Sequence, residues 1–89
     1  MSPTETDLYS VLLLNDDKTP MEFVVDVLQD VFEMDRDDAI NLMFSVHTDG
    51  SAECGQFAYE EANRKAAEVI GLAREHRHLL QCMVKRRAK

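Results

Sequence analysis

Residues 15–23 read Asn-Asp-Asp-Lys-Thr-Pro-Met-Glu-Phe, and this stretch joins a short apolar run at residues 11–14 to an amphipathic segment. Thr19 and Glu22 have the spacing of a capping box, and Pro20 lies between them at a position that suits the first residue of a helix. The stretch therefore predicts a helix that begins at Pro20 with Thr19 as its N-cap. Three side chains with oxygen acceptors then fall in a tight loop between a strand and this helix: Asn15, Asp16 and Asp17.

This loop lies beside a helix whose first apolar residues are Met21 and Val24. Acceptors next to an exposed apolar group suit a ligand with a cationic head and an apolar tail. An α-ammonium group offers only N–H donors, which the amide oxygen of Asn15 and the carboxylate of Asp16 can accept, and the carboxylate charge strengthens such a bond. The alternative is that Asn-Asp is ordinary turn chemistry, and Asp17 is expected to act as a local cap that supports the loop.

Hydrophobic periodicity along the rest of the chain predicts the order β-α-α-β-α-β. Strands are expected at residues 9–14, 51–57 and 79–84, and helices at residues 20–32, 36–47 and 59–75. Asp35 is expected to be the N-cap of the second helix. Three strands and three helices in 89 residues fit an α+β fold with one small sheet. We divide the chain into a short flexible N-terminal tail (1–8), one core domain (9–84) and a basic C-terminal tail (85–89).

The net charge of −7 is unevenly distributed, because the first 61 residues carry 15 of the 17 acidic residues and only two of the 10 basic ones. Such an acidic part disfavours nucleic acid and favours cationic ligands or a basic partner. The basic end is either a solvated tail or a contact for an acidic surface. No apolar run approaches the roughly 20 residues of a membrane-spanning helix, and no secretory signal is present, so we expect a cytoplasmic protein with its two cysteines unpaired.

Residues 15–17 followed by residues 19–24 resemble the signature of the ClpS family, whose members are small adaptors that hand N-end-rule substrates to a Clp AAA+ unfoldase. The resemblance covers the core from Tyr9 to Val84. It continues at Val27-Leu28, Met43 to His47, Gly50, Cys54-Gly55 and Ala73-Arg74-Glu75. It implies an antiparallel sheet packed against the helices, no cofactor and no enzymatic activity. Ala58 departs from the pattern, since the family usually has a Thr N-cap there.

The resemblance also assigns roles to individual residues. The set implied for the substrate's α-ammonium group is Asn15, Asp16 and His47, with Asp17 and Thr19 as supporting loop residues. The implied walls of a hydrophobic pocket are Met21, Val24, Met43, Val46 and Leu80. Glu60 and Lys65 lie where the family docks on the N-terminal domain of its unfoldase. From position alone the alternatives are a helix C-terminal histidine, plain core residues and a solvated helix surface, respectively.

We therefore predict an adaptor that binds free N-termini of proteins whose first residue is Leu, Phe, Tyr or Trp, and that delivers these N-degron substrates to a ClpA-type unfoldase. A β-branched first residue should clash with Met21, because its side chain is stiff at χ1. The rival classes are an acidic protein-interaction module without a peptide pocket and a small hydrolase that uses Asp16 or His47. A metal site is disfavoured, because the spacing of the four candidate ligands matches no zinc pattern: Cys54, His76, His78 and Cys82.

Overall fold

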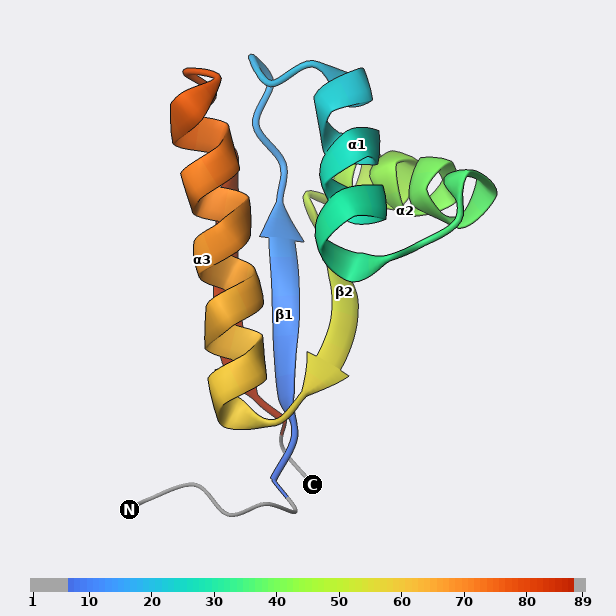
Figure 1. The fold of residues 1–89 in the computed structure, drawn as a ribbon. Helices are drawn as coiled ribbons and strands as arrows, with labels where there is room; N and C mark the ends of the chain where they lie inside the picture. Colours follow the sequence, from blue (N-terminus) through green and yellow to red (C-terminus); the bar gives the residue numbers. More distant parts are fainter. Residues whose placement is uncertain (1–6, 88–89) are drawn as a thin grey trace.

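The computed structural model describes residues 7–87. Its elements follow one another as β1 (Tyr9–Leu14), α1 (Met21–Phe32), α2 (Arg36–Asp49), β2 (Ser51–Phe57), α3 (Tyr59–Glu75) and β3 (Gln81–Arg86) (Figure 1). The predicted order β-α-α-β-α-β and the single antiparallel sheet are confirmed. None of the helices in the described part is long and apolar enough to cross a bilayer.

The sheet has the strand order β2-β1-β3, so that β1 is paired along both of its edges. The side chains of Val11 and Leu13 are fully buried, whereas Leu12 and Leu14, which alternate with them, are half-buried, so the apolar run of β1 is not buried equally on both faces. The pairing of β1 with β2 shifts register between Val11 and Leu12, which marks a β-bulge in β2 around Cys54. The loop that carries Asn15 and Asp16 follows directly from the carboxyl end of β1, which is paired on both edges.

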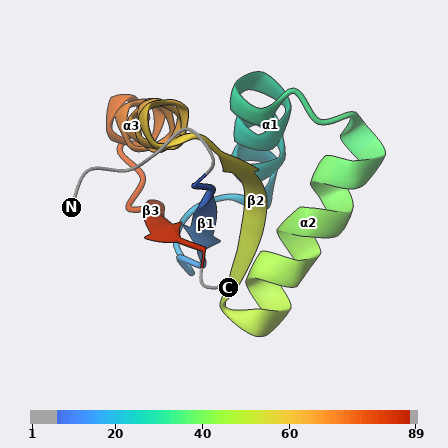
Figure 2. The ribbon, with the colours of Figure 1, turned by 90° about the horizontal axis from the view of Figure 1, so that it is seen from below.

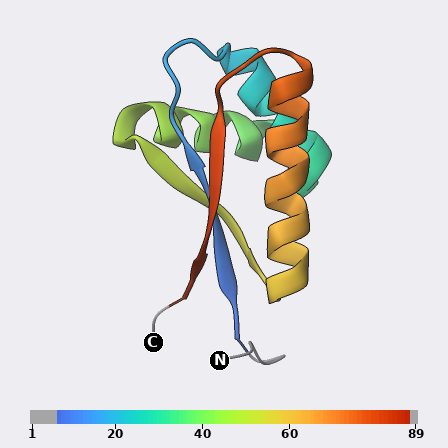
Figure 3. The same ribbon diagram turned by 90° about the vertical axis from the view of Figure 1, so that its left-hand side faces the viewer.

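Two of the helices cover one face of the sheet, and the third lies along one edge (Figure 2). Helix α3 packs on β1 and β3, helix α1 lies beside α3, and α2 contacts β2 and α1. Figure 3 shows α3 alongside the sheet, with α2 crossing behind the carboxyl end of β1 and the start of β3. The core is formed where the apolar faces meet, and its largest fully buried side chains are Val11, Leu13, Val27, Leu28 and Val69.

The start of α1 differs from the prediction. The helix begins at Met21, Pro20 occupies the cap position, and no side chain caps the first turn. Thr19 is not the N-cap because its hydroxyl is turned back along the loop, where it donates to Asp16 Oδ2 at 2.5 Å. The Pro20 carbonyl accepts instead from the N–H groups of Phe23 and Val24. The predicted capping box is therefore wrong, and Thr19 stabilises the loop rather than the helix.

Helix α2 begins as predicted and ends later than predicted. Asp35 caps it by accepting from the backbone N–H of Asp38 at 2.8 Å. The helix was expected to reach His47 but continues to Asp49, where Gly50 adopts a left-handed conformation with φ of 90°. The Gly50 carbonyl then accepts from the backbone N–H of Asn15 at 2.9 Å. This bond joins the loop after β1 to the end of α2.

The last strand also lies two residues later than expected, at Gln81–Arg86 instead of 79–84. Lys85 and Arg86, which we had assigned to the basic tail, therefore belong to β3. Arg86 pairs with Asp7 at 3.3 Å, and the backbone N–H of Arg87 donates to Leu8. Most of the predicted N-terminal tail, residues 1–6, and the final residues 88–89 lie outside the described part of the chain.

Both cysteines are buried as free thiols in the sheet, Cys54 in β2 and Cys82 in β3. Burial raises the pKa of the Cys54 thiol from 9.0 to about 12 and that of Cys82 to about 11. Because the thiolate is the reactive form, we expect both cysteines to resist a thiol reagent such as Ellman's reagent at pH 8. Labelling should become fast only in denaturant. Rapid reaction of either thiol in the native protein would contradict this prediction.

Candidate functional site

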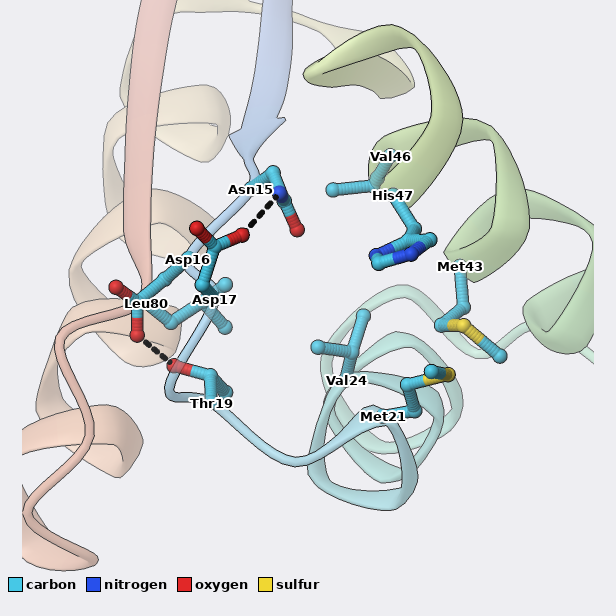
Figure 4. Close-up of a pocket in the computed structure, with 10 residues that line it drawn as sticks. All are labelled: Asn15, Asp16, Asp17, Thr19, Met21, Val24, Met43, Val46, His47 and Leu80. Carbon is cyan, nitrogen blue, oxygen red and sulfur yellow. Dashed lines mark hydrogen bonds between the residues drawn. The ribbon is translucent and has the colours of Figure 1, made fainter.

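A cavity of about 250 Å³ opens where the loop after β1, the start of α1, the end of α2 and the start of β3 meet (Figure 4). The residues that line it are Asn15, Asp16, Asp17, Thr19, Met21, Val24, Met43, Val46, His47 and Leu80. The structure thus brings together every residue that we predicted for the ammonium set, the supporting loop and the hydrophobic pocket. Their roles in binding a ligand stay predictions.

The polar side of the cavity is held in place by the loop's own hydrogen bonds. Thr19 donates to one oxygen of Asp16 through its hydroxyl, and its backbone N–H donates to the Asp16 carbonyl at 3.1 Å. Asn15 donates through its side-chain amide to Asp17 Oδ1 at 3.2 Å. This second bond leaves the amide oxygen of Asn15 as a free acceptor, because the N–H₂ end is the end that is used.

Three side chains at the cavity can each accept a further hydrogen bond. Within residues 7–87, the Asn15 amide oxygen, the second oxygen of Asp16 and the His47 ring have no hydrogen-bond partner. Neutral histidine offers one ring nitrogen as an acceptor, so three different side chains can each accept one bond from the same group. His47 is exposed at the end of α2, and Figure 4 shows its ring between the side chains of Asn15 and Met43.

The apolar side of the cavity is formed by two facing helices and by Leu80. Val24 on α1, Met43 and Val46 on α2, and Leu80 are all buried. Met21, by contrast, is 50% exposed at the first position of α1, so it lies at the opening of the cavity. The sequence alone would have placed these apolar residues in an ordinary core, and the structure shows that they are buried yet border a cavity.

The carboxylates of Asp16 and Asp17 do not face one another. Asp16 accepts from Thr19 and Asp17 accepts from Asn15, so the two acidic groups are held by different partners. A carboxylate pair that acts as general acid and base needs both groups within reach of one substrate bond. The arrangement therefore gives no support to a hydrolase that would use Asp16 and Asp17 as its acid and base.

The two residues implied for docking lie at the other end of the molecule. Glu60 is exposed in the first turn of α3, which starts at the opposite end of β1 from the cavity (Figure 1). Lys65 is half-buried, and its ammonium group donates to the Val31 carbonyl at 2.8 Å. The same Nζ lies 5.3 Å from the ring centre of Phe57 and 5.8 Å from that of Phe32. Lys65 thus already has internal partners at the end of α1.

The residues considered for a metal site do not come together as one group. His76 and His78 stack with their ring centres 6.4 Å apart after α3, whereas Cys54 and Cys82 are buried in the sheet. In the described part of the chain, no group of three or more His, Cys, Asp or Glu side chains is arranged to hold a metal ion.

Fold and cavity together define a small α+β domain with a cavity that sets hydrogen-bond acceptors beside an apolar recess. The family model described as "ATP-dependent Clp protease adaptor protein ClpS" matches residues 4–83. The chain belongs to the ClpS family, which is a family of adaptors and not of proteases.

Individual relatives agree with this assignment. The chain is 49% identical over 81 residues to "ATP-dependent Clp protease adapter protein ClpS 1" of Agrobacterium fabrum, covering 91% of this chain and 69% of the relative. It is 52% identical over 80 residues to the ClpS adapter of Brucella canis, covering 90% of this chain and 69% of the relative. The solved structure of Agrobacterium tumefaciens ClpS2 bound to L-phenylalaninamide superposes with a TM-score of 0.89 at 38% identity, covering 91% of this chain and 98% of that one.

Proposed function

We propose that this protein binds the free N-terminus of proteins that begin with a large hydrophobic residue and delivers them to a Clp unfoldase and protease. The observation that carries the proposal is the cavity, in which three acceptors with free capacity lie beside apolar walls. L-Phenylalaninamide, the ligand in the ClpS2 structure, combines a free α-ammonium group with a large apolar side chain. The polar side of the cavity complements such an ammonium group, and the apolar side complements such a side chain.

The geometry of the cavity supports the roles that the family resemblance implies. Asn15, Asp16 and His47 accept hydrogen bonds from the α-ammonium group, while Asp17 and Thr19 hold the loop. The first side chain of the substrate enters the apolar recess, whose volume of about 250 Å³ is below that of a typical drug-sized pocket and suits a single side chain. Met21 at the opening excludes β-branched first residues. The protein itself catalyses no reaction in this proposal.

The interactions are sufficient for a useful affinity. Burial of one large apolar side chain contributes about 1.5–3 kcal/mol, and each hydrogen bond to a charged group contributes about 1.5–3 kcal/mol at best. A micromolar complex requires about 8 kcal/mol. One side chain and three charge-assisted bonds contribute about 6–12 kcal/mol before the cost of association, a range that includes the micromolar value.

Delivery to the unfoldase is proposed to use the opposite end of the molecule. Glu60 is exposed at the start of α3, away from the cavity, so a docked partner and a bound N-terminus would not compete for the same surface (Figure 1). Lys65 would contribute through the cluster that it forms with Phe32 and Phe57. We propose a ClpA-type unfoldase as the partner and the cytoplasm as the compartment, where the two thiols stay reduced.

The test is a binding titration with four peptides that differ only at the start, beginning Phe, Leu, Val and acetyl-Phe. Free Phe and Leu peptides are expected to bind, whereas Val should bind poorly because of the clash with Met21. Acetylation removes the positive charge, so acetyl-Phe should bind at least about tenfold more weakly. Equal affinity for the free and the acetylated Phe peptide would exclude an ammonium site, and cleavage of any peptide would favour a hydrolase.

A further inference from the structure

Phe23 lies between two cavity residues in sequence but does not line the cavity itself. Met21 and Val24 face the recess, whereas the half-buried ring of Phe23 contacts the segment that follows α3. Its ring centre lies 4.6 Å from that of His78 in an edge-to-face arrangement and 5.3 Å from that of His76. The first turn of α1 is therefore tied to a second element by aromatic contacts.

That second element carries another wall of the cavity. Leu80 follows His78 by two residues, and the segment reaches it through a tight turn after α3. Arg77 adopts a left-handed conformation with φ of 60°, and the backbone N–H of His78 donates to the Ala73 carbonyl at 2.7 Å. The position of Leu80 thus depends on how this short turn is anchored.

Leu80 belongs to the buried core but also borders open space on two sides. It is only 4% exposed, yet it borders two hollows, the cavity described above and a second one, also of about 250 Å³. The second hollow lies between the end of α3 and the start of β3, and its lining includes Ala73, His78 and Leu80. On the two sides that face the hollows, Leu80 has fewer neighbours than a side chain enclosed all round. The contacts of His78 and His76 with Phe23 join the segment that carries Leu80 to α1.

We infer that Phe23 and His78 are positioning residues that set the width of the cavity between α1 and Leu80, and thereby determine which apolar first residue binds best. This inference rests on the proposed function. Neither residue touches the bound side chain. They act through Met21 and Val24 on one side and through Leu80 on the other.

The expected direction follows from how each ligand fills the recess. With the aromatic contact in place, the walls are held at one separation. Without it, α1 and the Leu80 segment can move apart, so that a Leu side chain loses contacts while a Trp side chain can still span the recess. A specific aromatic pair changes an equilibrium by about twofold to tenfold, which bounds the expected change in selectivity.

The experiment compares Phe23→Leu with Phe32→Leu, using the dissociation constants of peptides that begin with Leu and with Trp. Both substitutions remove a half-buried aromatic ring from α1, but Phe32 stacks near Phe57 at the far end of the helix, with ring centres 6.2 Å apart. In Phe23→Leu, selectivity is expected to move toward Trp by about threefold to tenfold. In Phe32→Leu, the ratio of the two constants should not change.

A second pair of variants separates positioning from general destabilisation. His78→Ala should shift the ratio as Phe23→Leu does, and His78→Phe should restore it, because phenylalanine keeps a ring against Phe23. An unchanged ratio in Phe23→Leu, or an equal shift in Phe32→Leu, overturns the inference while leaving the proposed function intact. If the unaltered protein binds neither peptide, the proposed function itself fails.

Discussion

Replacing Asp16 with alanine is expected to weaken binding of a Phe-initiated peptide by about 100-fold or more. Asp16 is the only carboxylate of the proposed ammonium set, and one of its oxygens has no partner within residues 7–87. Its loss would remove a charge-assisted bond of about 1.5–3 kcal/mol and leave the positive group of the ligand partly desolvated without a counter-charge. A binding titration on the purified variant measures the change directly.

Asp16 also stabilises its own loop, and this effect on stability has to be measured apart from its effect on binding. The same carboxylate accepts from the Thr19 hydroxyl, so Asp16→Ala should lower the free energy of unfolding by about 1 kcal/mol. Thr19→Val removes that hydrogen bond but keeps the carboxylate. It should cost similar stability, while its binding loss should be at least about tenfold smaller.

A charge control completes the comparison. Asp26 is exposed on α1 and does not line the cavity, so Asp26→Ala changes the net charge by the same amount without touching the site. Its affinity for the peptide should stay close to that of the unaltered protein. If Thr19→Val weakened binding as much as Asp16→Ala, then Asp16 would act as a support of the loop and not as a ligand for the ammonium group.

Replacing Leu13 with alanine is expected to lower the free energy of unfolding by about 2–5 kcal/mol. Leu13 is fully buried on the central strand, where both neighbouring strands and the helices enclose it. A domain of this size has a total stability of about 5–15 kcal/mol, so the melting temperature should fall by about 10 °C or more. Thermal unfolding followed by circular dichroism provides the measurement.

Leu79→Ala is the matched control for this second prediction. Leu79 is 67% exposed, so the same change of side chain should shift stability by no more than about 0.5 kcal/mol. Below its melting temperature, Leu13→Ala should still bind the Phe peptide, because Leu13 does not line the cavity. Equal melting temperatures for the two variants would mean that β1 is not the centre of the core.

Much of the candidate site could be predicted because several of its residues lie next to a recognisable strand or at the start of a recognisable helix. Asn15 and Asp16 follow an apolar strand directly, and Met21 and Val24 open an amphipathic helix. The resemblance to the ClpS family added His47 and Leu80, which local patterns alone would not have joined to the loop. The structure places all of these side chains around one cavity.

The N-cap of α1 could not be predicted from the local sequence pattern. The spacing of Thr19 and Glu22 is that of a capping box, but the Thr19 hydroxyl donates to Asp16 instead of accepting from the helix. The Thr19 hydroxyl could bond either to the first turn of the helix or to Asp16, and the conformation of the loop places it against Asp16. The contact of Phe23 with His78 was missed for a similar reason, since it joins residues that are far apart in the chain.

The sequence by itself determined the order of the helices and strands and the chemistry of the loop that follows β1. These properties depend on local periodicity and on residue type, which act over a few neighbouring residues. Only the tertiary structure decided that buried methionine and valine side chains border a cavity instead of filling it. The bond from Asn15 to the Gly50 carbonyl and the turn before Leu80 bring distant parts of the chain together at this cavity, and such long-range contacts leave no periodic signal in the sequence.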